Sequence, residues 1–143
     1  MKLLPLALLL FVACGNEEDW TPDLAVDSLN EQVGCNAVEY DGVSVFIRFR
    51  NVKMDIIWTD AVINHNTQVI GFTDMKKIWI TTKISDNYKA EVLLHELGHN
   101  FLLKDTDDTT KVMSLWQDTP LTMTKIVEFA KEVKDITCKK PGT

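Results

Sequence analysis

The stretch from residue 87 to about residue 103 constrains the fold of this chain more than any other. It contains no proline, a single glycine and good helix formers throughout, so it favours a long helix. Three residues can cap its start: Ser85, Asp86 and Asn87. Apolar side chains gather on one side of the helical wheel: Leu93, Leu94, Leu97 and Phe101. The segment is therefore predicted to bury one side in the core and to leave another side for polar residues.

That other side carries the pattern His95-Glu96-Leu97-Gly98-His99. Two imidazoles four residues apart on a helix project from the same face, and both can reach one tetrahedral zinc ion at about 2.0–2.1 Å. Glu96 points to the same side but is rotated away from the metal, so its carboxylate can hold a zinc-bound water. Zinc lowers the pKa of that water towards about 7, and Glu96 can carry its proton to the leaving amine of a peptide. The pattern predicts amide hydrolysis; the alternative is a helix with two surface histidines.

The third ligand of such a site is not obvious from the pattern. A catalytic zinc usually has three protein ligands, and the chain has three histidines in all. The remaining one, His65, lies between two asparagines and is typical of a loop. Asp105 offers a carboxylate six residues after His99, but two more aspartates follow at 107 and 108, so a solvated acidic loop is the alternative for Asp105.

The beginning of the chain is typical of a secretory signal. Met1 and Lys2 form a short basic start, and residues 3–12 are apolar apart from Pro5, a run too short to span a bilayer comfortably. We therefore expect residues 1–13 to be removed on export, which takes one lysine and moves the net charge from -6 to -7. An acidic chain of about 130 residues suits one domain and argues against nucleic acid as a partner.

The end of this segment, Phe11-Val12-Ala13-Cys14, resembles the lipobox of bacterial lipoproteins. The resemblance implies cleavage before Cys14 and acylation of its sulfur, so that a lipid anchors the protein to a membrane of the cell envelope. We expect outer-membrane or surface placement; the alternative is ordinary secretion. Residues 14–21 then form the lipidated cysteine and a polar spacer, and residues 22–143 form the folded domain.

Export changes the interpretation of the two remaining cysteines, Cys35 and Cys138. In an oxidising compartment one disulfide can join the two ends of the domain. The alternative is two buried free thiols, because the sequence does not give the Cα separation that decides between them.

A first helix is expected over residues 22–33. Thr21 followed by Pro22 is typical of a cap and the first helical position, and Gly34 can end the helix.

A last helix is expected to begin at Thr122. Leu121 before this cap and Ile126 after it could form a hydrophobic staple. The apolar face of this helix consists of Met123, Ile126, Val127, Ala130 and Val133.

Between these helices, before residue 87, the sequence predicts four strands. The β-prone runs are residues 43–49, 55–58, 68–73 and 78–81. In the first of them apolar residues alternate with other side chains at a period of two: Val43, Val45, Ile47 and Phe49.

The stretch from His95 to Asp105 resembles the extended motif of metzincin-type zinc peptidases, HExxHxxGxxH. The last ligand position of that motif falls on Asp105, and the metzincins similar to snapalysin have Asp there. The resemblance implies that His95, His99 and Asp105 bind one zinc ion and that Glu96 is the general base.

Other segments are similar to the same family. Residues 111–114, Lys-Val-Met-Ser, look like the Met-turn, whose methionine, here Met113, lies beneath the metal site in metzincins. Residues 52–58 look like an early strand of the matrixin type, and residues 121–126 look like the start of the final helix. The likeness covers roughly residues 43–136.

One residue departs from the family pattern. Leu102 stands where metzincins have the glycine at the turn out of the helix. The backbone conformation at that glycine is costly for a branched side chain, so we expect the chain to turn differently on its way to Asp105. In gluzincins the third ligand comes from a later helix instead, where Glu128 or Glu132 could serve.

The resemblance also implies how a substrate binds. In metzincins an extended peptide adds itself to an antiparallel edge strand above the zinc, which suggests residues 68–73 here. Specificity then depends on the pocket under Met113 to Trp116.

Together these observations predict an α/β (α+β) domain with a small, mixed and mostly parallel sheet. It is completed by an antiparallel edge strand, a zinc-binding helix, a Met-turn and a C-terminal helix. The expected function is that of a monomeric endopeptidase with one catalytic Zn²⁺ that acts on polypeptides. The alternatives are a catalytically silent, lipid-anchored binding module with the same fold and a structural envelope lipoprotein without a metal.

Overall fold

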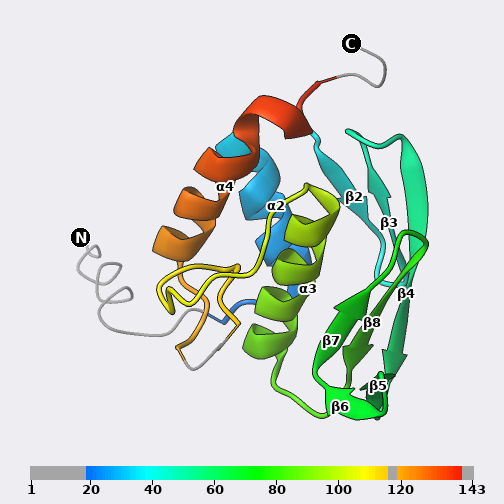
Figure 1. Ribbon diagram of the computed structural model, residues 1–143. Coiled ribbons are helices and arrows are strands. Elements are labelled where there is room, and N and C mark those ends of the chain that lie inside the picture. Colours follow the sequence, from blue (N-terminus) through cyan, green and yellow to red (C-terminus); the bar gives the residue numbers. More distant parts are fainter. Residues whose placement is uncertain (1–18, 116–118, 140–143) are drawn as a thin grey trace, which may run out of the picture.

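The computed structural model describes residues 19–115 and 119–139. In chain order the elements are α2 (Pro22–Val33), β2 (Val38–Tyr40), β3 (Ser44–Ile47), β4 (Val52–Thr59), β5 (Val62–Asn64), β6 (Thr67–Val69), β7 (Gly71–Thr73), β8 (Lys77–Thr81), α3 (Asp86–Asn100) and α4 (Met123–Thr137). Two helices, α2 and α3, pack on one face of a five-stranded sheet, and α4 packs against α2 on the side away from the sheet (Figure 1). The predicted signal peptide, the predicted lipidation site Cys14 and Trp116 lie outside the described residues.

The sheet has the order β2-β3-β4-β8-β7. It is mixed, as predicted, but the expectation of a mostly parallel sheet is wrong, because only β4 and β8 are parallel. The other neighbours in the sheet are joined by connections of three or four residues, and parallel neighbours need a crossover of about a dozen or more. At one edge of the sheet, β7 pairs antiparallel with β8.

The prediction of four strands is also wrong, since the structure has seven strands among the described residues. The run 68–73 splits into β6 and β7, which belong to different sheets. A tight hairpin joins β5 to β6, with φ of 54° at His65 and 65° at Asn66, the positive values that hairpin turns require. This turn confirms His65 as a loop residue, and it turns the chain back before β7 begins.

The alternation in the first predicted strand holds only at its centre. Val45 and Ile47 are buried in the core, but Val43 is 65% exposed. Val43 and Phe49 lie outside β3 (Ser44–Ile47). The strand is shorter than predicted because tight turns occupy the residues on both sides of it.

The first and last helices begin as predicted. Thr21 accepts a hydrogen bond from the backbone of Leu24, Pro22 is the first residue of α2, and Gly34 ends it with φ of 87°. Thr122 caps α4 by accepting from the backbone of Lys125.

The helix α3 forms the centre of the domain. Ser85 is its cap, and the four apolar residues predicted to face the core are completely buried: Leu93, Leu94, Leu97 and Phe101. The helix ends at Asn100 rather than near Leu103, because the chain leaves it through the turn at Leu102 described below.

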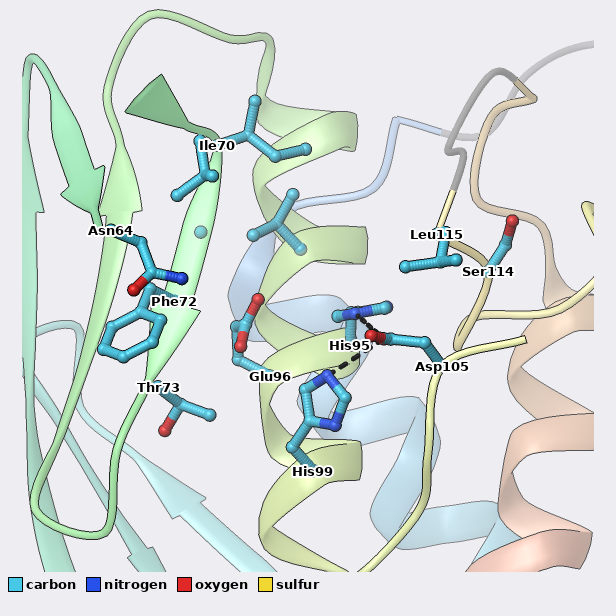
Figure 2. A pocket seen from close by; sticks show the side chains of 13 residues that line it. Asn64, Ile70, Phe72, Thr73, His95, Glu96, His99, Asp105, Ser114 and Leu115 are labelled. Atoms are coloured by element: carbon cyan, nitrogen blue, oxygen red, sulfur yellow. Dashed lines mark ion pairs between the residues drawn. The ribbon is translucent and has the colours of Figure 1, made fainter. Parts of the chain in front are cut away.

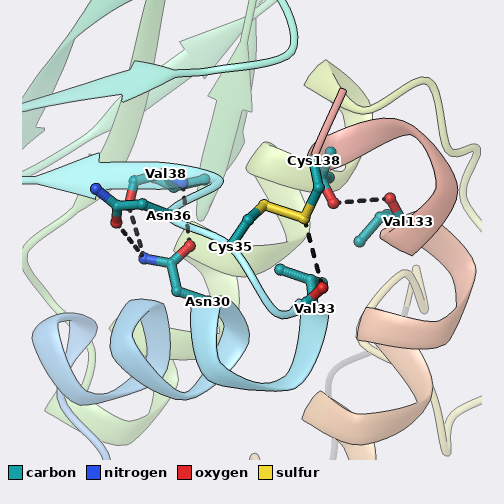
Figure 3. Close-up of a disulfide and its surroundings, with 8 residues drawn as sticks. Asn30, Val33, Cys35, Asn36, Val38, Val133 and Cys138 are labelled. Carbon is teal, nitrogen blue, oxygen red and sulfur yellow. Dashed lines mark hydrogen bonds between the residues drawn. A yellow bond between two sulfur atoms is a disulfide. The ribbon is translucent and has the colours of Figure 1, made fainter. Parts of the chain in front are cut away.

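A disulfide between Cys35 and Cys138 joins the segment after α2 to the end of α4, with a Cα–Cα distance of 5.7 Å (Figure 3). It links positions 103 residues apart, so it closes nearly the whole domain into one loop. No helix in the described part of the chain is long and apolar enough to cross a membrane.

Candidate metal centre

One helix and one loop bring three metal-binding side chains together. His95 and His99 come from successive turns of α3, and Asp105 comes from the loop that follows it (Figure 2). The Oδ1 atom of Asp105 lies 3.0 Å from Nε2 of His95 and 3.0 Å from Nε2 of His99. One ligand atom from each of the three residues lies within 4.8 Å of the other two.

Backbone carbonyl groups orient both imidazoles. Nδ1 of His95 lies 2.9 Å from the carbonyl oxygen of Val112, and Nδ1 of His99 lies 3.0 Å from that of Leu103. A carbonyl oxygen can only accept, so each Nδ1 carries the hydrogen and donates it. In the neutral rings Nε2 then has a free lone pair, which points at Asp105 in both cases.

Three lone-pair atoms that converge on one point need a positive charge between them. A proton on an imidazole is one source of that charge, but burial lowers the pKa of His95 and so favours its neutral form. A metal ion is the other source. Two imidazole nitrogens and one carboxylate oxygen are a donor set that zinc accepts in catalytic sites, so these residues fit the ion that the sequence predicted.

The chain reaches Asp105 through a turn that the sequence reasoning did not expect. Leu102 itself adopts the left-handed conformation, with φ of 74°, so the expectation of a different turn is wrong. The turn is held by hydrogen bonds from the backbone N–H of Leu102 to the carbonyl of His99 and from that of Leu103 to the carbonyl of Gly98. The side chain of Leu102 is 71% exposed, so the branched residue avoids steric clashes with the core while it bears the backbone strain.

The segment around Met113 packs against α3, the helix that carries both histidines. Met113 is buried, and a Cβ atom added to Gly98 would lie 2.2 Å from its Sδ atom. The glycine of the histidine pattern therefore leaves the space into which this methionine packs. Thr106 and Ser114 form an isolated parallel bridge. This bridge fixes the segment after Asp105 beside the segment of Val112, whose carbonyl group accepts the hydrogen bond from His95.

Glu96 lies on the side of α3 that faces the sheet (Figure 2). It is only 6% exposed, yet no hydrogen bond or ion pair reaches its carboxylate from the described residues. Burial raises its pKa to about 8, and the Asp105 carboxylate adds to the rise. A carboxyl group without a protein partner, beside three ligand atoms, is free to interact with a bound molecule.

A cleft of about 590 Å³ opens over these residues. One wall is formed by β7 and the residues before it, and the other wall includes Ser114 and Leu115. The side chain of His95 is 11% exposed, that of His99 30% and that of Asp105 37%, so the three ligands open towards the cleft. A solvent molecule or a substrate can reach them there.

The other candidates for the third ligand lie elsewhere. His65 is in the turn of the β5–β6 hairpin, outside the cluster of ligand atoms. Glu128 pairs with Lys131 and Glu132 with Lys111, each at 3.3 Å. None of these three carboxylate or imidazole groups belongs to the cluster formed by the described residues.

Two residues at the contact between α3 and β7 were missed in the sequence analysis. Gly71 lies against α3, where an added Cβ atom would be 2.5 Å from Cγ1 of Val92 and 3.0 Å from Oε2 of Glu96. Asn100 is a buried polar residue four positions after Glu96. A glycine inside a β-prone run and a polar residue at helical spacing from Glu96 are the signals that could have identified them.

Comparisons with protein families, with curated proteins and with solved structures find no match for this chain. The arguments about the site therefore depend on its own geometry and on the motifs in the sequence.

Proposed function

We propose that this protein is a zinc-dependent endopeptidase that hydrolyses peptide bonds of polypeptides. The observation that carries the proposal is the convergence of His95, His99 and Asp105 within 4.8 Å next to a buried carboxyl group, Glu96, that has no partner among the described residues. A purely structural ion-pair cluster does not need such a carboxyl group in an open cleft.

The two histidines and the aspartate would hold the metal. Their hydrogen bonds to the carbonyls of Val112 and Leu103 keep Nε2 of each ring directed at one point, which preorganises the site. When bound, zinc would polarise a substrate carbonyl and acidify a water molecule.

Glu96 would be the general base and then the general acid. Its position between the ligands and β7 suits a group that accepts a proton from water on one side and passes it to the leaving amine on the other. The carboxyl group lines the same cleft as the three ligands, so a water molecule or a substrate at the metal would lie within its reach.

The polypeptide would bind in an extended conformation along β7. Among the described residues this strand pairs only with β8, so its other edge has backbone groups available for a bound strand. Main-chain pairing of this kind accepts many sequences, which suits an enzyme that acts on polypeptides.

Zinc content and hydrolysis test the proposal together. The purified protein should bind about one zinc ion per chain, and His99→Ala and Asp105→Ala should both weaken that binding. Glu96→Gln should keep the zinc and lose hydrolysis of an unfolded protein by about 10²–10⁴-fold, the range of general acid–base catalysis.

Each departure from this pattern has its own meaning. If the parent protein binds no zinc under metal-replete conditions, the proposal of a zinc-dependent enzyme is wrong. Full zinc in Asp105→Ala moves the third ligand elsewhere. Bound zinc without any Glu96-dependent cleavage supports the alternative of a catalytically silent binding module.

We also propose that the protein is exported and anchored by a lipid on Cys14. The disulfide between Cys35 and Cys138 supports export, because structural disulfides persist in oxidising compartments. Mass spectrometry of the membrane-extracted protein should find residues 1–13 removed and an acylated Cys14, whereas an unmodified chain in the medium would support secretion.

A further inference from the structure

One side of α3 faces the edge strand β7 between Val92 and Asn100. Val92, Glu96 and Asn100 follow one another at four-residue spacing on that side. The two residues of β7 next to them are Gly71, which lies against Val92 and Glu96, and Thr73, which contacts Asn100. Glu96 therefore lies between two points at which the strand touches the helix.

At one of these points contact is steric. No Cβ atom fits at Gly71, because it would come within 2.5 Å of Val92 and 3.0 Å of the Glu96 carboxylate. The backbone of β7 thus approaches the helix as closely as side-chain packing allows.

At the other point contact is a hydrogen bond. The Nδ2 group of Asn100 donates to Oγ1 of Thr73 at 3.1 Å and to the carbonyl oxygen of Glu96 at 3.1 Å. Its Oδ1 atom accepts from Nη1 of Arg50, and Nη2 of Arg50 donates to the carbonyl oxygen of Met75 at 3.3 Å. Asn100 is only 4% exposed, so its amide group is placed by protein contacts rather than by water.

These bonds connect three parts of the fold to the last turn of α3, which includes Glu96 and His99. Thr73 ends β7, Met75 lies in the turn between β7 and β8, and Arg50 lies in the turn between β3 and β4. Among the described residues β7 pairs on one side only, with β8. Its end is also held by the Thr73 hydroxyl group, which lies 3.0 Å from the carbonyl oxygen of Asp74 and 3.1 Å from that of Lys77. This position needs a donor for Thr73 and an acceptor for Arg50. The amide group of Asn100 provides both, whereas an aspartate or an alanine cannot.

We infer that Asn100 is a positioning residue that fixes the separation between β7 and α3. This inference rests on the proposed function, because the separation sets how a strand bound to β7 presents its carbonyl group to Glu96 and the metal ligands. Asn100 contacts neither the Glu96 carboxylate nor the ligand atoms, and it acts through Thr73 and the backbone carbonyl of Glu96.

Three variants dissect these contacts. Asn100→Ala removes all of them, and Asn100→Asp keeps an acceptor for Arg50 and removes the donor to Thr73. Thr73→Val removes the hydroxyl group at nearly constant volume, and with it the bond that this group donates to the carbonyl of Asp74 or Lys77. Asn30→Ala is the matched control, because the Asn30 amide joins α2 to β2 in the same way, through bonds of 2.8 and 3.1 Å with Val38 (Figure 3).

Hydrogen exchange of the intact protein, without metal and with zinc, is the first measurement. The amides of residues 71–75 should exchange about three- to tenfold faster in all three variants, as expected for the loss of one hydrogen bond. In Asn30→Ala they should exchange as in the parent. Unchanged exchange in Asn100→Ala and Thr73→Val, or equal acceleration in Asn30→Ala, overturns the inference.

Kinetics of the zinc-loaded protein are the second measurement. Thr73→Val and Asn100→Asp should raise KM about three- to tenfold for long peptides that span β7. They should leave zinc content unchanged, and Asn30→Ala should leave both zinc content and KM as in the parent. Parental KM values for long peptides contradict the positioning role.

The two measurements separate the two ideas. A parent protein without Glu96-dependent cleavage contradicts the proposed function, while the exchange of β7 still decides whether Asn100 holds the strand. A parent protein that cleaves, with variants that keep both its exchange and its KM, contradicts only the inference about Asn100.

Discussion

Two buried glutamates on α3, five residues apart, have opposite surroundings. Glu91 is 1% exposed and pairs with Nζ of Lys125 from α4 at 2.8 Å, and the same ammonium group donates to the carbonyl of Thr119 at 3.0 Å. Glu96 is 6% exposed and faces β7 without a hydrogen bond or ion pair from the described residues. Burial raises the pKa of both carboxyl groups, and only at Glu91 does a lysine oppose the rise.

The difference shows how one helix serves two purposes. The side of α3 that faces α4 is packed and its charge is matched, so the loss of one partner there is costly. The side that faces the cleft keeps an unmatched carboxyl group beside three metal-binding side chains, an arrangement that costs stability and is typical of functional sites. Burial alone would not have distinguished the two residues.

The largest expected effect on stability is at the matched pair. Lys125→Met should cost about 3–5 kcal/mol, because it leaves the buried Glu91 charge without a partner. Glu96→Gln should instead stabilise the metal-free protein near neutral pH, since no partner is lost and the cost of an unmatched buried carboxyl group is removed. Urea unfolding of both variants measures the contrast, and similar losses would remove the distinction between the two glutamates.

The pH dependence of stability should come from Glu96. Its pKa is 4.5 in an ordinary environment and about 8 in the folded protein, so between these values the folded state binds the extra proton. Stability of the metal-free protein should therefore fall as pH rises, by on the order of 1 kcal/mol per pH unit. Unfolding curves of the parent and of Glu96→Gln between about pH 5.5 and pH 7.5 should show a steeper fall in the parent; parallel curves would count against an unpartnered Glu96.

The packed side of α3 should resist any added atom. Gly98→Ala would place a methyl group 2.2 Å from Sδ of Met113 and 3.0 Å from Cε1 of Phe129. Overpacking should outweigh the better helix propensity of alanine and leave a net loss of about 1–2 kcal/mol. Thermal unfolding checks this, and a stabilised variant would show that the segment around Met113 moves to accommodate the added methyl group.

The smallest effect is expected at the exposed end of α3. Leu102→Gly should stabilise the protein by about 1 kcal/mol, because it relieves the left-handed conformation of a branched residue that buries little surface. Leu102→Ala is the control: it keeps the Cβ atom and should show no such gain. An equal gain in both variants would mean that the strain is not the cause.

The helices were predictable because their signals are local. Thr21, Pro22 and Gly34 mark α2 within a few residues of its ends, and Thr122 marks the start of α4. The side of α3 that carries His95 and His99 follows from four-residue spacing alone.

The sheet was less predictable, because pairing depends on residues far apart in the chain. The antiparallel arrangement follows from connections of three or four residues, which are too short for parallel crossovers. The split between β6 and β7 follows from the turn at His65 and Asn66. Asn100 was missed because its partners, Arg50 and Thr73, lie far from it in sequence.

The sequence by itself determined that two imidazoles and a glutamate lie on one side of a capped helix, because helical spacing needs no other part of the chain. Only the tertiary structure decided that Asp105 meets these imidazoles through a left-handed Leu102, that Val112 and Leu103 orient the rings, and that β7 lies against Glu96. The reason is that distances between distant segments are set by the packing of the whole core and by buried hydrogen bonds, which no local pattern encodes.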